Sequence, residues 1–260
     1  MIESAITATP SVPMRLARVV LRWWLVVGVI LLWQLWVTLA ELNSVVMPSP
    51  WAVVREIVNQ PGLFLGAAAQ TIAMALLGLC LGMAVGCGLA MLAWMSSILS
   101  GLLTPITLIF ASVPVVGIVP ILARLFGYGT GTVLAIVTII CFFPAFVFTS
   151  AGLRSLPAGS ADLFGVLGAR TGTRLRLLAL PAAVPDIAIA FRVGAAHSVL
   201  AAMVAEFLMG VSGLGHLFEA ARTTLDMAQA IGASAVAAAI SIAVFVLATF
   251  AEAKVRAAWR

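Results

Sequence analysis

The chain has 260 residues, of which 63% are hydrophobic and 9% are charged, and its formal net charge is +5. Soluble domains are about 45–50% apolar and about 25% charged. Composition therefore excludes a soluble enzyme, a nucleic-acid-binding domain and a disordered chain. With a mean hydropathy of +1.21, the sequence predicts an all-α protein that crosses a membrane several times.

Six apolar segments are each long enough to cross about 30 Å of hydrocarbon. We expect each to be a helix, because a helix satisfies its own backbone polar groups, which lipid cannot do. The first segment follows Arg15, Arg18 and Arg22, and its length favours a retained anchor over a secretory signal. In chain order the expected spans are residues 19–40, 65–94, 102–125, 132–153, 182–209 and 231–251.

The basic residues are distributed unevenly over the connections between these spans. With the amino terminus in the cytoplasm, ten lie on the cytoplasmic side, three on the other side and one inside a span, which accounts for all 14. Cytoplasmic connections carry an excess of Lys and Arg, so we expect both termini in the cytoplasm. Residues 1–18 are then a cytoplasmic segment, and residues 19–260 form one membrane domain with its core at 65–253.

Two spans carry small or helix-breaking residues. Gly78, Gly82 and Gly86 recur every four residues in the second span, which favours close contact with another helix. Pro114 lies near the middle of the third span, where a broken helix needs protein or a water-filled path to cover its freed carbonyls. Pro114 is therefore a candidate for lining a pathway, with a kinked structural helix as the alternative.

The connection between the fourth and fifth spans, here called the connecting segment (residues 155–181), is too long and patterned for a passive link. Pro157 fits the start of a helix, and Gly168 is placed to end it. Thr171 is placed to cap a second short helix. One side of the first helix is an apolar stripe formed by Leu163, Val166 and Leu167.

Two interpretations of this segment are open from its residue pattern. The amphipathic helix, the turn and the second helix with Arg170, Arg174 and Arg176 can lie on the membrane surface. The same unit can instead insert into a groove of a soluble partner. Composition does not choose between the two.

The connecting segment resembles the cytoplasmic signature of permease subunits of bacterial ATP-binding-cassette (ABC) importers. That signature is Glu-Ala-Ala, three residues, Gly, nine residues, Ile, any residue, Leu-Pro. The sequence departs from it at Leu163 and Phe164, where the family has two alanines, so the resemblance implies a bulkier docking surface. The spacing holds throughout, with Gly168 at the glycine and the other matching positions at Asp162, Leu178, Leu180 and Pro181.

Further motifs resemble the nitrate, sulfonate, taurine and bicarbonate branch of this family, and together they cover most of residues 45–220. The resemblance implies a type I importer permease fold with six spans, a coupling helix between the fourth and fifth, and a place in the bacterial inner membrane. The motifs are Met47-Pro48-Ser49-Pro50, residues 125–130, residues 151–155, Val204-Ala205-Glu206 and residues 212–215.

The resemblance also implies partners: a second copy in a homodimer, two cytoplasmic ATPase subunits, an extracytoplasmic binding protein and membrane lipid, with no nucleic acid. The chain has no Gly-x-x-x-x-Gly-Lys-Ser/Thr phosphate loop. We therefore expect no enzyme activity, no metal and no cofactor on this chain, and ATP with Mg on the partner ATPase. The residues expected to couple to the ATPase are Asp162, Leu163, Phe164, Leu167, Gly168, Ala169, Arg170, Leu178, Leu180 and Pro181.

Three polar residues of the fifth span are further candidates for the pathway, because a charge inside a span costs about 2.5–3.5 kcal/mol. Arg192 matches an arginine of the family's fifth span, with anchoring of the cytoplasmic connections as its alternative role. His197 can donate to an anionic solute or satisfy a backbone carbonyl. Glu206 can line the pathway, make a structural hydrogen bond or be solvated at the interface.

The expected function is import of a small anionic solute of the sulfonate, taurine, nitrate or bicarbonate type. A vitamin precursor of the thiamine or riboflavin type and a secondary transporter are the alternatives. A secondary transporter needs coupling-ion sites near the bilayer midplane, and no span has an acidic residue at its middle. An intramembrane serine protease is disfavoured, because the hydroxyl of Ser212 would need a histidine on a later span to activate it.

Overall fold

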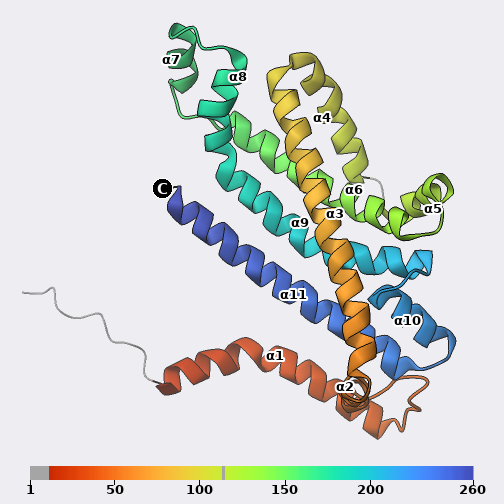
Figure 1. Ribbon diagram of the computed structural model, residues 1–260. Helices are drawn as coiled ribbons and strands as arrows, with labels where there is room; N and C mark the ends of the chain where they lie inside the picture. The colour runs from red at the N-terminus through yellow and green to blue at the C-terminus, as the bar shows by residue number, and fades with distance from the viewer. Residues whose placement is uncertain (1–11, 113–114, 260) are drawn as a thin grey trace, which may run out of the picture.

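The computed structural model describes residues 12–112 and 115–259, and these ranges contain helices and no strand (Figure 1). The helices are α1 (Val12–Leu39), α2 (Pro50–Asn59), α3 (Pro61–Met95), α4 (Ser97–Ser112), α5 (Val115–Phe126), α6 (Thr130–Arg154), α7 (Ser160–Val166), α8 (Thr171–Arg174), the π-helical turn η1 (Leu175–Ala179), α9 (Leu180–Met209), α10 (Leu214–Thr223) and α11 (Met227–Ala258).

Four helices in the described ranges are long and apolar enough to cross a membrane. They are α3, α6, the continuous helix Thr171–Met209 and α11, and they coincide with the expected second, fourth, fifth and sixth spans. Helix α1, with 28 residues, contains the first expected span up to Leu39, and its part Trp24–Leu39 is apolar. In place of the third span, α4 ends at Ser112 and α5 begins at Val115. Six continuous spans are therefore not confirmed, and Pro114 lies outside the described residues.

Helices α3 and α6 pack closely along the glycine positions of α3. A Cβ added to any of the three glycines would lie well inside van der Waals distance of α6, so the predicted close contact is confirmed and its partner is identified. The added Cβ would lie 2.4 Å from Cγ1 of Val137 at Gly78, 2.6 Å from Cβ of Cys141 at Gly82, and 2.5 Å from Cβ of Ala145 at Gly86.

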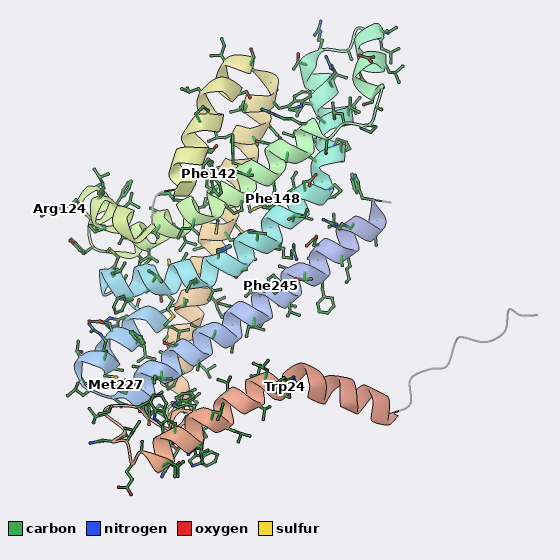
Figure 2. The ribbon with its side chains drawn as sticks, turned by 180° about the vertical axis from the view of Figure 1, so that it is seen from behind. Trp24, Arg124, Phe142, Phe148, Met227 and Phe245 are labelled. Atoms are coloured by element: carbon green, nitrogen blue, oxygen red, sulfur yellow. The ribbon has the colours of Figure 1, made fainter. Side chains whose placement is uncertain are left out.

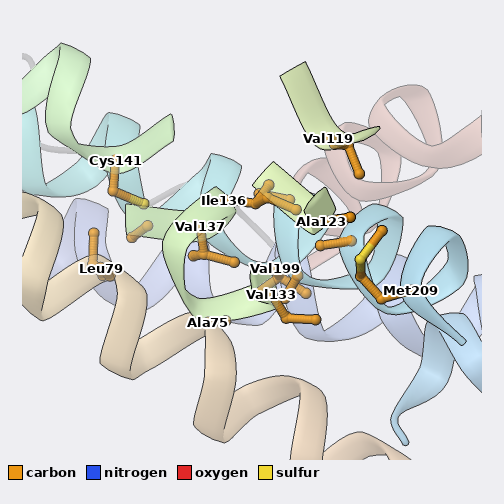
Figure 3. Close-up of a cluster of buried hydrophobic side chains, with 14 of the residues drawn as sticks. Ala75, Leu79, Val119, Ala123, Val133, Ile136, Val137, Cys141, Val199 and Met209 are labelled. Carbon is orange, nitrogen blue, oxygen red and sulfur yellow. The ribbon is translucent and has the colours of Figure 1, made fainter. Parts of the chain in front are cut away.

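The largest buried apolar cluster lies where α3, α5, α6 and α9 meet (Figure 3). Leu79 of α3, Val137 of α6 and Val199 of α9 are each at most 1% exposed. Such close packing holds helices together by dispersion contacts where lipid gives no hydrophobic driving force. The cluster therefore fixes α9 in the body of the molecule, between the connecting segment at one end and α10 at the other.

The two ends of the molecule carry different elements (Figure 1). Helices α7 and α8 of the connecting segment project at one end, and α2 and α10 lie at the other. Helix α1 runs apart from the body with Trp24 exposed (Figure 2). The arrangement places the connecting segment at the end where α9 begins and α11 finishes.

Candidate functional site

Helix α7 ends at Gly168 in a Schellman motif. The N–H of Ala169 donates to the carbonyl of Phe164 and the N–H of Gly168 to the carbonyl of Gly165, both over 3.0 Å. Gly168 has a φ of +64°, a conformation that glycine adopts without steric cost. The prediction that Gly168 ends the first helix is confirmed.

The beginnings of both short helices differ from the prediction. Helix α7 begins at Ser160, not at Pro157, because the N–H and hydroxyl of Ser160 both donate to the carbonyl of Pro157 and close a turn there. Thr171 is the first residue of α8 and not its cap. The preceding residue, Arg170, is extended and makes no side-chain capping hydrogen bond.

The second short helix is not a separate element. Helix α8 continues through η1 into α9, so Thr171–Met209 forms one helix of 39 residues. The π-helical turn directly precedes Leu180 and Pro181. Turns of this kind occur often at functional sites. The end of the connecting segment is therefore joined to the membrane body without a flexible link.

The predicted apolar stripe of α7 is exposed to solvent in this chain. Leu163 is 57%, Val166 88% and Leu167 69% exposed, whereas Phe164 and Ala169 are half-buried. Asp162 is exposed in the first turn. Leu178, Leu180 and Pro181 are half-buried on the membrane side of the segment. The exposed group thus comprises the carboxylate and apolar side chains of α7.

The arginines of the connecting segment carry positive charge that no described acidic side chain neutralises. Among the described residues, no ion pair includes Arg170, Arg174 or Arg176. Arg170 and Arg176 are exposed beside α7 and η1. An exposed apolar face flanked by unpaired cations is suited to a partner that offers both an apolar groove and acidic groups.

Arg192, a candidate for the pathway, is engaged by α11. Its Nε lies 2.7 Å from Oε2 of Glu252, close enough for an ion pair although the N–H is not aligned for a hydrogen bond. Its Cζ also lies 5.9 Å from the ring centroid of Phe245. Glu252 pairs a second time with Arg256, over 2.9 Å. These contacts join Arg192 to α11 and not to the cytoplasmic connections.

His197 lies on the exposed side of α9. Its Nδ1 is 2.8 Å from the carbonyl of Val193, one turn earlier in the helix. A carbonyl only accepts, so Nδ1 carries the proton in this hydrogen bond. The other ring nitrogen, Nε2, is then an acceptor in the neutral ring and a donor in the protonated ring. His197 offers that nitrogen to whatever faces α9.

Glu206 is 1% exposed and is held inside the chain. Its Oε2 accepts from the hydroxyl of Thr71 over 2.8 Å and from the N–H of Gly215 over 3.1 Å. The hydroxyl of Thr71 in turn accepts from the N–H of Leu214 over 2.8 Å. Gly213 is required beside the carboxylate, because an added Cβ would lie 2.2 Å from Cδ of Glu206. This network ties the beginning of α10 to α3 and α9.

The structure does not bring the pathway candidates together. Arg192 is bound to α11 near the middle of α9, Glu206 is enclosed near the end of α9, and His197 is exposed between them. Glu252 and Trp259 were not among the expected site residues, although with Phe245 they recur every seven residues and so lie on one side of α11 and its end. Thr71 was not expected either, and the sequence carries no signal for it.

Two further expectations concern catalytic and metal chemistry. No hydrogen bond joins Ser212 to His216 in the described part of the chain, and both side chains are exposed. Within the same ranges, no group of three or more His, Cys, Asp or Glu residues is placed to hold a metal ion.

The chain is similar to proteins of known class. The family described as "Binding-protein-dependent transport system inner membrane component" matches residues 78–257. A Haemophilus influenzae protein named as an ABC transporter permease is 30% identical over 85% of this chain and 91% of its own length. A Halalkalibacterium halodurans protein named as a formylaminopyrimidine transport permease is 27% identical over 69% of this chain and 72% of its own length.

A Bacillus subtilis protein named as an aliphatic sulfonates transport permease is 27% identical over 75% of this chain and 71% of its own length. Among solved structures, an inward-facing methionine ABC transporter, MetNI, has a chain that superposes with a TM-score of 0.62. It is 20% identical, and the match covers 82% of this chain and 99% of that one. This likeness concerns the fold.

Proposed function

Because this chain belongs to the family of binding-protein-dependent transport inner-membrane components and is an ABC importer permease subunit, we propose that two copies form the pathway of an importer. Two ATPase subunits bind the connecting segment in the cytoplasm, and a binding protein delivers the solute from the other side. Both termini then lie in the cytoplasm of a bacterial cell, and the chain resides in the inner membrane. ATP and Mg are held by the ATPase subunits.

The single observation that carries this proposal is the exposed apolar face of α7, which lies directly before the continuous helix Thr171–Met209. Leu163, Val166 and Leu167 are exposed although no lipid-facing span includes them. Exposed apolar side chains rimmed by charges mark interaction sites. A groove on the ATPase subunit would cover this face, and the 39-residue helix would carry its movement into the membrane.

The proposed coupling residues divide into two groups by exposure. Asp162, Leu163, Leu167, Gly168 and Arg170 are exposed and would contact the ATPase subunit directly. Phe164, Ala169, Leu178, Leu180 and Pro181 are half-buried and would hold the shape of the segment.

His197 is the pathway residue that we propose on this chain. An ionisable side chain within a span faces protein or water in preference to lipid, because lipid exposure is costly. The exposed side of α9 around His197 would therefore face the second copy and the pathway between the two chains. Arg192 and Glu206 are engaged within the chain, so they would act on the pathway only through α9.

For the solute we propose a small anion of the sulfonate, taurine, nitrate or bicarbonate type, supported by the relative named for aliphatic sulfonates. A vitamin precursor of the thiamine or riboflavin type is the second candidate, supported by the relative named for formylaminopyrimidine. With Arg192 neutralised by Glu252, the pathway face of α9 offers little fixed positive charge. Selectivity would therefore reside mainly in the binding protein.

The experiment that tests the proposal is ATP hydrolysis by the reconstituted complex. The permease is purified with its ATPase subunits, placed in liposomes and supplied with binding protein loaded with each of a panel of solutes. Stimulation by a sulfonate or another small oxyanion supports the anion, and stimulation by a formylaminopyrimidine supports the second candidate. Absence of any copurifying ATPase subunit would contradict the proposed function as a whole.

A further inference from the structure

The carboxyl end of α11 meets the end of the connecting segment. The indole Nε1 of Trp259 donates a hydrogen bond of 2.7 Å to the carbonyl of Pro181, 78 positions earlier in the chain. Pro181 is the last residue of the connecting segment and the second residue of α9. The tail of the chain is therefore bound to the point where the segment enters the membrane body.

The carbonyl of Pro181 is free to accept this hydrogen bond because of Pro185. In an α-helix the carbonyl of one residue accepts from the N–H four positions later. Position 185 is a proline inside α9 and has no N–H to donate. The indole of Trp259 supplies the donor that Pro185 cannot, in a hydrogen bond at the surface of the molecule.

A second set of contacts joins α9 and α11 further along both helices. Arg192 pairs with Glu252 and lies over the ring of Phe245. Pro181 and Arg192 are 11 positions apart (192 − 181), about three turns, so they share a side of α9. Phe245 and Glu252 of α11 and Trp259, the residue that follows its end, recur every seven residues and so lie on one side.

We propose that Phe245 and Glu252 of α11, with Trp259 directly after it (together called the α11 stripe), make α11 a second arm, beside α9, that carries movement of the connecting segment into the membrane body. Movement delivered to the connecting segment would pass through Pro181 and Arg192 into α11 as well as along α9. Helix α11 begins directly after α10, at the opposite end of the molecule (Figure 1). This inference rests on the proposed function of the connecting segment, and Trp259 and Glu252 are positioning residues within it.

The test follows the movement of α10 in the complete complex. In a chain whose three cysteines are replaced by alanine, Thr223→Cys reports on the end of α10 and Thr130→Cys on the beginning of α6. The rate of maleimide labelling is measured with and without ATP and vanadate, which trap the ATPase subunits closed. The decisive variant is Trp259→Phe, which keeps a ring and removes the N–H, with Trp36→Phe as the matched control.

In Trp259→Phe we expect the vanadate-induced change at position 223 to fall by about threefold or more, as for loss of one hydrogen bond. The change at position 130 and the copurification of ATPase subunits should remain. An unchanged response at position 223, or an equal loss at both positions, would overturn the proposal. Trp36→Phe should leave both responses intact.

Pro185→Ala provides an independent variant, because it restores an N–H that competes with Trp259 for the carbonyl of Pro181. It should reduce the response at position 223, and adding Trp259→Phe should cause little further loss. If the two substitutions reduced the response at position 223 additively, they would act independently. That result would contradict competition for the carbonyl of Pro181. If the unaltered chain retains no ATPase subunit, the proposed function fails, whereas retained subunits with a normal response in Trp259→Phe refute the α11 arm alone.

Discussion

The hydroxyl of Thr71 on α3 donates a hydrogen bond of 2.8 Å to the carboxylate of Glu206 on α9, across 135 positions of sequence. The same hydroxyl oxygen accepts from the N–H of Leu214 at the beginning of α10. One small side chain therefore joins three helices at the end of the molecule opposite the connecting segment. Both of its bonds are buried, so its removal leaves the N–H of Leu214 without this acceptor and Glu206 with only the N–H of Gly215 as a donor.

Thr71→Val should lower the free energy of unfolding by about 1–3 kcal/mol, because the buried N–H of Leu214 loses its acceptor. Valine matches threonine in shape, so the loss reports the hydroxyl. Thr71→Ser keeps the hydroxyl and should recover most of the stability. Thermal unfolding of the purified chain in detergent measures both. Equal stability of the valine and serine variants would show that the hydroxyl has no structural role.

Gly82→Ala should destabilise the contact between α3 and α6. The added Cβ would lie 2.6 Å from Cβ of Cys141, and such overpacking costs about 1–3 kcal/mol. Gly88→Ala on the same helix is the matched control, because its Cβ would meet nothing within 4 Å. The control should keep or raise the unfolding temperature in detergent. A Gly82→Ala chain as stable as the control would refute the close contact.

Gly168→Val should release the ATPase subunits during copurification. A β-branched residue is strained at a φ of +64°, so the turn after α7 would be lost and the exposed apolar face displaced. Gly101→Val introduces the same side chain at an exposed helical position of α4 with open space around it. We expect the control to retain the subunits. Retention by both variants would mean that this turn does not shape the docking surface.

His197→Phe and His197→Gln separate the roles of the ring. If Nε2 donates to an anionic solute, the glutamine amide can replace it and the phenyl ring cannot. Solute uptake by the reconstituted importer should then fall strongly in the phenylalanine variant and remain in the glutamine variant, at unchanged ATPase copurification. Equal uptake by both variants would show that the side chain at position 197 does not donate a hydrogen bond to the solute.

Much of this architecture could be predicted from the sequence, because lipid leaves few choices for an apolar chain. The helices that contain residues 65–94, 132–153, 182–209 and 231–251, the glycine contact of α3 and the turn at Gly168 all follow from local patterns. Hydropathy alone did not reveal that α8 runs on into α9, because the π-helical turn η1 depends on packing around Leu175–Ala179. The third expected span is divided between α4, which ends at Ser112, and α5, which begins at Val115.

The polar contacts were harder to predict than the helices. Glu206, Arg192 and His197 were recognised as unusual because charge and polarity in a span need a reason. Their partners could not be identified, since Thr71 and Glu252 come from helices distant in sequence and pair only after the helices pack. The bond between Trp259 and Pro181 has a local cause in Pro185, but its donor is supplied 78 positions later.

The unbroken helix Thr171–Met209 has one more consequence. At about 1.5 Å per residue, its 39 residues extend for about 58 Å, close to twice the thickness of the hydrocarbon layer. Even a tilted helix of that length must stand well clear of the lipid at one side. In the proposed complex this helix would set the distance between the bilayer surface and the ATPase subunit. Inserting or deleting a turn within it would shift the docking face by about 5 Å along the helix axis.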